Sequence, residues 1–174
     1  EHLYGVLHAI KNQIQIKFVY QKYWEDELTE RIVEPYALKE FKNRWYVLSK
    51  DLGDDKIKSF ALDRLTELEI LNKKFNFPKD FDVNEHYRYC FGIISPNGHQ
   101  PEDVILSFNA FQGKYIKSLP LHDSQQILID NEHELRIQLK LFITHDFFME
   151  LLSFGENLEV LKPQNLIDDL KSTV

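Results

Sequence analysis

The alternation of apolar and polar residues divides the first 75 positions into one helix and five strands. Residues 3–12 repeat apolar side chains at helical spacing, and residues 14–20 alternate like a strand with one buried face. A second strand is predicted at 29–34, ended by Pro35 because proline cannot donate into a ladder, with residues 36–41 continuing it after a bend. The other strands predicted in this half cover residues 44–49, 56–62 and 66–71.

Short connections between these five strands predict antiparallel pairing and closure into a small barrel, which removes exposed sheet edges. The run at 44–49 carries apolar area on both faces, since its odd-numbered residues face one side and its even-numbered residues the other. We expect Trp45 in the core, because large aromatics dominate cores. Tyr46 suits a core position and a ligand-facing position equally well.

The second half shows a different order of elements. Residues 82–90 are predicted to form a helix with Asp82 as its N-cap, and Gly155 is typical of the position just after a helix. Further elements are predicted at strand 104–108, helix 110–119, strands 126–130 and 135–143 around a turn at 131–134, helix 146–154, strand 158–161 and a helix from Pro163 to residue 170. The order strand-helix-strand-strand-helix-strand predicts a ferredoxin-like arrangement.

Three segments of the first half carry a family resemblance: Arg31-Ile32-Val33-Glu34-Pro35-Tyr36, Trp45-Tyr46-Val47 and Lys58-Ser59-Phe60-Ala61-Leu62-Asp63-Arg64-Leu65. In this order they resemble the WYL domain over about residues 14–75. The resemblance implies an Sm-like, SH3-type barrel that senses a nucleic acid or nucleotide in bacterial transcription regulators, downstream of a helix-turn-helix domain. The chain departs from the family pattern at Val47, where the family has leucine, and at Lys58 and Ala61, where it often has arginine.

The second half resembles the C-terminal extension that commonly follows the WYL barrel. The similar segments are Phe91-Gly92, residues 121–125 and residues 155–163. The predicted fold is therefore α+β: a helix and five-stranded barrel over residues 1–81, then a ferredoxin-like domain over residues 82–174. The boundary falls at the proline-containing connector 75–81.

Charge is unevenly distributed between these two parts. The chain has a net charge of −7, residues 1–81 hold 14 basic and 14 acidic residues, and residues 82–174 hold 7 and 14. An acidic surface repels phosphate backbones, so a nucleotide or nucleic-acid contact is expected in the first half.

The candidate ligand-binding residues are cations and tyrosines on or beside the predicted strands of the first half. We expect several of them to converge on one mouth or groove of the barrel, where guanidinium groups pair with phosphate and a tyrosine stacks on a base. The simpler alternative is that the rings are core and the cations are solvated. The candidates are Tyr20, Arg31, Arg44, Tyr46, Lys58 and Arg64.

Other chemistries find no support in the sequence. No two histidines have the spacing of a metal site, no glycine-rich phosphate loop is present, and no serine or cysteine has a nucleophile motif. We therefore expect no metal, no cofactor and no enzymatic activity. A single cysteine, Cys90, fits a reducing compartment, and no apolar run approaches the roughly 20 residues that span a bilayer. The expected location is cytoplasmic, with no membrane contact.

The sequence thus predicts the ligand-sensing and oligomerisation part of a bacterial transcription regulator. Its effector is an anionic nucleotide or single-stranded nucleic acid, it forms a homodimer, and duplex DNA is bound by an N-terminal domain outside this chain. A second hypothesis is a dimerisation and signal-relay module with no small ligand of its own. A third, an RNA-binding Sm-like ring, is disfavoured because the first half has no net positive charge.

Overall fold

The computed structural model describes residues 2–22, 24–96 and 98–173. The chain divides into two compact units, Glu1–His86 and Tyr87–Val174, which are described separately below. The sequence prediction had placed the division after residue 81. Within the described residues, no helix is long and apolar enough to cross a membrane.

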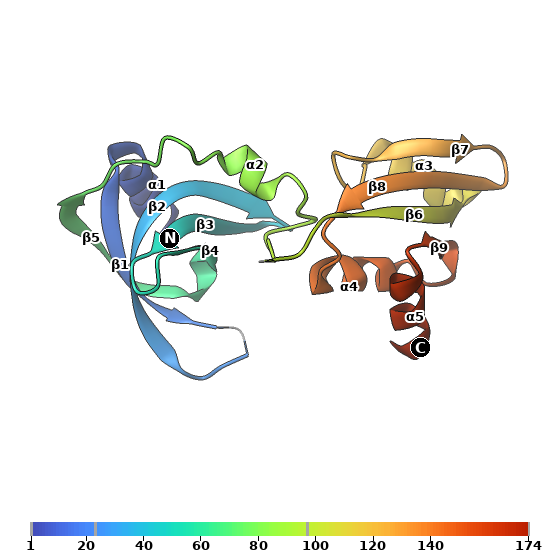
Figure 1. Ribbon diagram of the computed structural model, residues 1–174. Coiled ribbons are helices and arrows are strands. Elements are labelled where there is room, and N and C mark those ends of the chain that lie inside the picture. The colour runs from blue at the N-terminus through green and yellow to red at the C-terminus, as the bar shows by residue number, and fades with distance from the viewer. Residues whose placement is uncertain (1, 23, 97, 174) are drawn as a thin grey trace. The chain divides into compact units, whose positions relative to one another are not determined.

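The first unit is an antiparallel sheet of five strands with one main helix (Figure 1). The strand order is β4-β3-β2-β1-β5, so β4 and β5 end the sheet in the described pairings, and closure into a barrel stays a prediction. Its elements are α1 (Leu3–Asn12), β1 (Ile14–Gln21), β2 (Leu28–Phe41), β3 (Arg44–Asp51), β4 (Lys56–Ala61), the 3-10 helix η1 (Leu62–Arg64), β5 (Leu65–Lys74) and α2 (Val83–Tyr87).

Helix α1 packs its apolar stripe against one face of this sheet. Val6 and Ala9 are fully buried there, and they meet Ile16 and Phe18, the alternate residues of β1 that the pattern assigned to a buried face. The helix ends where Gln13 takes a left-handed conformation, with φ of 53°, and donates its backbone N–H to the carbonyls of the last turn. The helix and the buried face of β1 are therefore confirmed.

Strand β2 does not end at Pro35 as predicted but continues through it to Phe41. The pairing with β3 shifts register between Pro35 and Ala37, and a bulge of this kind tolerates a residue that cannot donate to the ladder. The predicted end at Pro35 was therefore wrong, and the continuation through residues 36–41 is confirmed.

Two further expectations were wrong in this unit. Trp45 lies near the start of β3 and is 39% exposed, so it is not a core residue. The helix predicted at 82–90 is only five residues long, although Asp82 caps it as expected: its Oδ1 accepts the N–H of Asn84 at 2.9 Å. The helix ends at Tyr87, well before Cys90.

The connector after β5 is packed rather than loose. Tyr36, on β2, is buried and sits at the centre of a group of rings, with centroids 6.0 Å from Phe75, 5.0 Å from Phe77 and 5.3 Å from Phe81. Aromatic contacts of this geometry add to the burial of apolar area. They hold residues 75–81 as part of the first unit.

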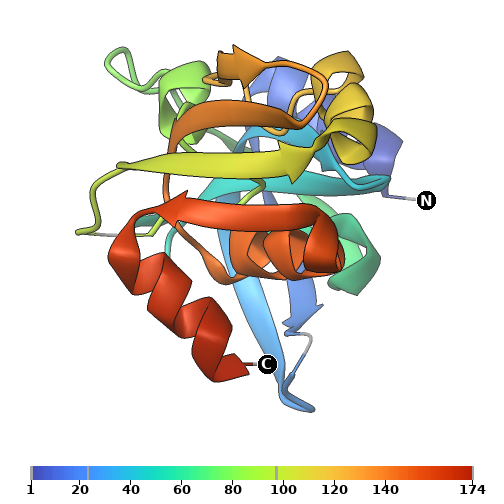
Figure 2. The same cartoon turned by 90° about the vertical axis from the view of Figure 1, so that its right-hand side faces the viewer.

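The second unit is a four-stranded antiparallel sheet in the order β7-β8-β6-β9 (Figure 2). One face of β6 and β8 is fully apolar and buried against residues of α3, α4 and α5, while the alternate residues are polar or partly exposed. The predicted order of elements is confirmed. They are β6 (Glu102–Asn109), α3 (Ala110–Ser118), β7 (Gln126–Asp130), β8 (Glu134–Leu141), α4 (His145–Ser153), the 3-10 helix η2 (Gly155–Asn157), β9 (Leu158–Lys162) and α5 (Gln164–Thr173).

Candidate anion-binding site on the first sheet

A cluster of charged side chains lies on the same face of the first sheet as the core. Val33 pairs with Asp51 across β2 and β3, so Arg31, two residues before Val33, projects to the side of Asp51. Ser49 lies two residues before Asp51 and pairs with Lys58 on β4. The strand register therefore brings two of the predicted cations to one place.

Asp51 is the centre of this cluster. Its Oδ2 accepts hydrogen bonds from Arg31 Nη1 at 2.8 Å and from Lys58 Nζ at 2.9 Å, and its Oδ1 accepts the Gly53 N–H at 2.9 Å. Lys58 also reaches Asp54 Oδ2 at 2.7 Å. One carboxylate, 4% exposed, thus joins β2, β3, β4 and the turn between the last two strands.

These contacts change the acidity of the groups involved. Burial alone would raise the pKa of the Asp51 carboxyl, but hydrogen bonds from Lys58, Gly53 and Arg31 outweigh it and leave the pKa below its ordinary value. Burial opposes the charge of Lys58 as well, and its bonds to Asp54 and Asp51 turn this into a raised pKa. The ion pairs are therefore fully charged at neutral pH.

Three aromatic rings lie beside the charged cluster. Phe60 is 5.2 Å from Phe18 and 5.0 Å from Tyr20 between ring centroids, in both cases edge to face. The guanidinium carbon of Arg31 lies 5.6 Å from the Phe60 centroid, and its Nε donates to Thr29 Oγ1 at 3.1 Å. Arg31 is therefore held in a fixed orientation by a carboxylate, a hydroxyl and a ring at once, and a guanidinium can pair with the oxygens of a phosphate.

Tyr20 closes this ring cluster toward η1. Its Oη accepts the backbone N–H of Ala61 at 3.1 Å, and its ring is half-buried. Burial raises the pKa of the Tyr20 hydroxyl and Asp63 acts in the same direction, while the Ala61 N–H and the charge of Arg64 act against them. Arg64 is thus close enough to Tyr20 for its positive charge to act on the pKa of the Tyr20 hydroxyl.

Arg44 and Tyr46 belong to the other face of β3. They alternate with Trp45, Val47 and Ser49, and Tyr46 pairs with Ala61 on β4. Arg44 lies within 3.5 Å of the Asp63 carboxylate, and both side chains of that pair are about half exposed. The structure therefore brings Tyr20, Arg31 and Lys58 to one face with Arg64 near Tyr20, and it separates Tyr46 from them.

The ligand-binding role of all six candidates stays a prediction. No group of three or more His, Cys, Asp or Glu side chains in the described part of the chain has the arrangement of a metal site. The sequence pattern did not single out Asp51, because it ended the strand at residue 49. It also gave no role to Ser49, whose Oγ is buried and has no hydrogen-bond partner among the described residues.

Comparison with protein-family models assigns each of the two units to a domain family. Residues 1–70 match the model of the WYL domain, and residues 100–174 match the model of the WCX domain. The chain contains a WYL domain followed by a WCX domain. The resemblance of the first half to the WYL domain is thereby confirmed. Arg31, Asp51, Lys58 and Arg64 all lie inside the matched WYL segment.

Two solved structures are similar to nearly the whole chain. A CRISPR Cas-related protein shares 13% sequence identity over 97% of this chain and 48% of its own, with a TM-score of 0.58. The proteasome accessory factor B/C (PafBC) of Arthrobacter aurescens shares 23% identity over 97% of this chain and 25% of its own, with a TM-score of 0.47. The WYL–WCX chain thus spans between a quarter and a half of these larger proteins. No curated protein sequence matches it significantly.

Proposed function

We propose that this WYL–WCX chain is the effector-sensing and oligomerisation part of a bacterial transcription regulator in the cytoplasm. The WYL unit, closed as an Sm-like barrel, binds an anionic nucleotide or single-stranded nucleic acid and catalyses no reaction. The WCX unit is ferredoxin-like, as its element order and the central position of β6 support. A helix-turn-helix domain before these units contacts duplex DNA, and two copies form the regulator.

The observation that carries this proposal is the fixed orientation of Arg31 beside the three rings. A guanidinium held by Asp51, Thr29 and the Phe60 ring is ready to pair with a phosphate without losing further side-chain freedom. Tyr20, next to Phe60, offers a surface on which a base can stack.

The charge balance limits how strongly this site can bind. Arg31 and Lys58 are already compensated by Asp51 and Asp54, so an incoming phosphate has to compete with both carboxylates. Arg64, near Tyr20, adds positive charge at the edge of the cluster. We therefore expect weak, strongly salt-dependent binding in which Arg64 matters as much as Arg31.

Fluorescence anisotropy of the whole chain with labelled short single-stranded DNA and RNA tests this, with unlabelled nucleotides as competitors at two salt concentrations. Arg31→Ala and Arg64→Ala should each weaken binding by roughly tenfold or more, since each removes hydrogen bonds to a charged group. Arg31→Lys should fall between, because it keeps the charge and loses the planar fork.

Lys17→Ala is the matched control. Lys17 is a cation on β1 that pairs with Glu30 at 3.5 Å and alternates with Phe18, so it projects from the opposite face. Circular dichroism confirms that each variant is folded. Absence of salt-sensitive binding, or an equal loss in Lys17→Ala, would contradict the proposed site.

A second candidate function is supported by the surface of α3. Phe111 and Tyr115 lie on α3, and Leu119 is the residue just after it. The three recur every fourth residue and are 66%, 58% and 78% exposed. An apolar stripe of this kind on a short helix is typical of a surface that a second copy covers. If the chain is a dimerisation and relay module, light scattering should show a dimer that Tyr115→Glu disrupts, with no binding in the anisotropy assay.

A further inference from the structure

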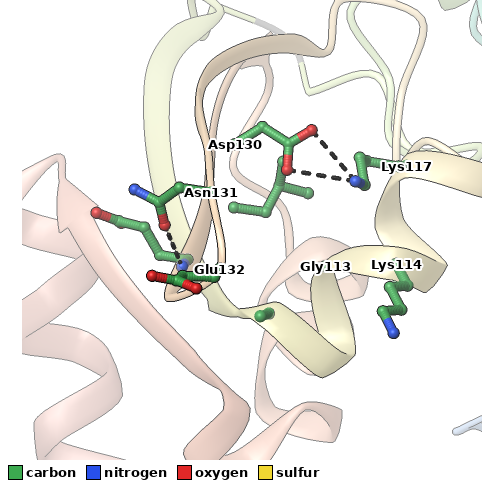
Figure 3. Close-up of a pocket in the computed structure, with 9 residues that line it drawn as sticks. Gly113, Lys114, Lys117, Asp130, Asn131 and Glu132 are labelled. Atoms are coloured by element: carbon green, nitrogen blue, oxygen red, sulfur yellow. Dashed lines mark hydrogen bonds and ion pairs between the residues drawn. The ribbon is translucent and has the colours of Figure 1, made fainter.

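The second unit contains a cavity that the proposed effector site does not use. It has a volume of about 320 Å³ and lies between α3 and the turn of the β7–β8 hairpin (Figure 3). This volume is at the lower end of the range for small-molecule sites. Its residues are Ala110, Gly113, Lys114, Lys117, Asp130, Asn131, Glu132, Glu134 and Leu135.

Gly113 explains why the floor of the cavity is close-packed and apolar. A Cβ atom at this position would lie 2.7 Å from Cβ of Leu135, which is buried on β8. Only glycine therefore lets α3 approach the strand so closely, although glycine costs a helix about 1 kcal/mol relative to alanine.

The walls of the cavity carry opposite charges. Lys114 and Lys117 come from α3, whereas the carboxylates come from the hairpin. Lys117 Nζ lies 3.2 Å and 3.3 Å from the two oxygens of Asp130, and Figure 3 shows this pair bridging the helix and the hairpin. Both side chains are about 40% exposed, so the pair contributes little stability and can exchange partners.

Two other hairpin residues are already satisfied within the unit. Glu134 accepts hydrogen bonds from Ser107 Oγ at 2.6 Å and from Arg136 Nη2 at 3.1 Å. Asn131 Oδ1 accepts the backbone N–H groups of His133 and Glu134, both at 2.9 Å, which fixes the turn. Glu132 lies 3.5 Å from His133 Nε2, and both of these side chains are more than 80% exposed, so Glu132 stays at the rim. Lys117 and Asp130 are the charged groups that bridge the helix and the hairpin, and their charges sum to zero.

We propose that this cavity binds a free α-amino acid as its zwitterion. The ligand carboxylate pairs with Lys117, its ammonium group pairs with Asp130, and a short apolar side chain lies over Gly113 and Leu135. A zwitterion satisfies both halves of the Lys117–Asp130 pair that it opens. An anion would leave Asp130 without a partner, and a cation would do the same to Lys117.

Isothermal titration calorimetry of the whole chain with each of the twenty amino acids in turn tests this proposal. We expect saturable binding by one or a few amino acids with short or branched apolar side chains. Lys117→Met and Asp130→Asn should each weaken it by about tenfold or more, because each removes a hydrogen bond to a charged group. Lys140→Met, a change to an exposed lysine of β8 outside the cavity, should leave it unchanged.

Ligand analogues give a second, independent readout. The N-acetyl derivative lacks the ammonium group and the amide lacks the carboxylate, so each should bind at least about tenfold more weakly than the parent amino acid. Failure of all twenty amino acids to bind would overturn the proposal, as would equal binding of the analogues. Neither outcome would affect the nucleotide site of the WYL unit, whose residues lie on the first sheet.

Discussion

Replacing Asp51 by asparagine tests whether one carboxylate organises the charged cluster of the WYL unit. Asparagine keeps an oxygen for the Gly53 N–H but loses the charge that Arg31 and Lys58 share. Each of these two hydrogen bonds between charged groups is worth about 1.5–3 kcal/mol. We therefore begin from a loss of roughly 3–6 kcal/mol in the free energy of unfolding.

The contacts that Lys58 and Arg31 keep in the variant reduce this expected loss in the free energy of unfolding. Lys58 is 28% exposed and keeps Asp54 at 2.7 Å, so its change should be small. Arg31 is only 16% exposed and keeps Thr29 and the Phe60 ring, which do not neutralise its charge. We expect Asp51→Asn to lower the free energy of unfolding by about 2–4 kcal/mol, mainly through Arg31.

Urea denaturation followed by circular dichroism measures this difference. Trp24 and Trp45 are both exposed, so tryptophan fluorescence would report unfolding poorly. Asp55→Asn is the matched control, because Asp55 is 77% exposed in its 3.8 Å pair with Lys50 and should change stability by less than about 0.5 kcal/mol. A change in Asp51→Asn no larger than that of the control would refute the reasoning.

Acid titration provides a second check on the same variant. The pKa of Asp51 is lower in the folded state, so its contribution to stability is present above the unfolded pKa of about 4 and is lost as pH falls through the folded value. The difference between wild type and Asp51→Asn should therefore shrink below about pH 4. A difference that stayed constant in this range would count against the role of the carboxylate charge.

Other predictions concern packing and helix capping, and all are measured as changes in the free energy of unfolding. Phe18→Ala, at a fully buried ring, should cost about 3–5 kcal/mol, whereas Trp45→Ala should cost about 1 kcal/mol or less; equal costs would place Trp45 in the core after all. Gly113→Ala should destabilise by about 1–3 kcal/mol because its Cβ meets Leu135. A Cβ at Gly5 meets the flexible ends of Leu68 at 3.2 Å and Ile70 at 3.9 Å, so Gly5→Ala should be neutral or stabilising, and the reverse order would contradict the packing of α3. Asn109→Ala should cost about 1 kcal/mol, since the Asn109 side chain accepts the N–H of Gln112 at the start of α3, and no change would mean that solvent satisfies this group equally well.

Local pattern predicted the elements of this chain well because most of them are amphipathic. The alternation at 14–20 and the helical spacing at 3–12 each depend on one buried face, and both faces are buried as expected. The errors arose at positions where contacts with other elements, and not the local pattern, determine the structure. Pro35 is accommodated by a bulge that exists only because β3 pairs beside it. Trp45 is 39% exposed near the start of β3, where the pairing with β4 begins only at Tyr46.

The charged cluster was harder to predict for the same reason. Arg31 and Asp51 are 20 residues apart, and only the register of β2 against β3 brings them within 2.8 Å. Alternation alone correctly separated Arg44 and Tyr46 from Trp45 and Val47 along one strand. Alternation gives no information on the register between two strands, so it could not identify Asp51 as the partner of Arg31.

The two oxygens of Asp51 face in different directions, one toward the cations and one toward the Gly53 amide in the turn between β3 and β4. An effector phosphate that competed with Asp51 for the hydrogen bonds of Arg31 and Lys58 would leave this carboxylate, which is only 4% exposed, less compensated. The Asp51 side chain would then have to rotate or take up a proton. Either response would weaken the hydrogen bond that Asp51 Oδ1 accepts from the Gly53 N–H. Occupancy of the face would thus be transmitted to a surface loop, where amide hydrogen exchange at Gly53 could report it without any label on the effector.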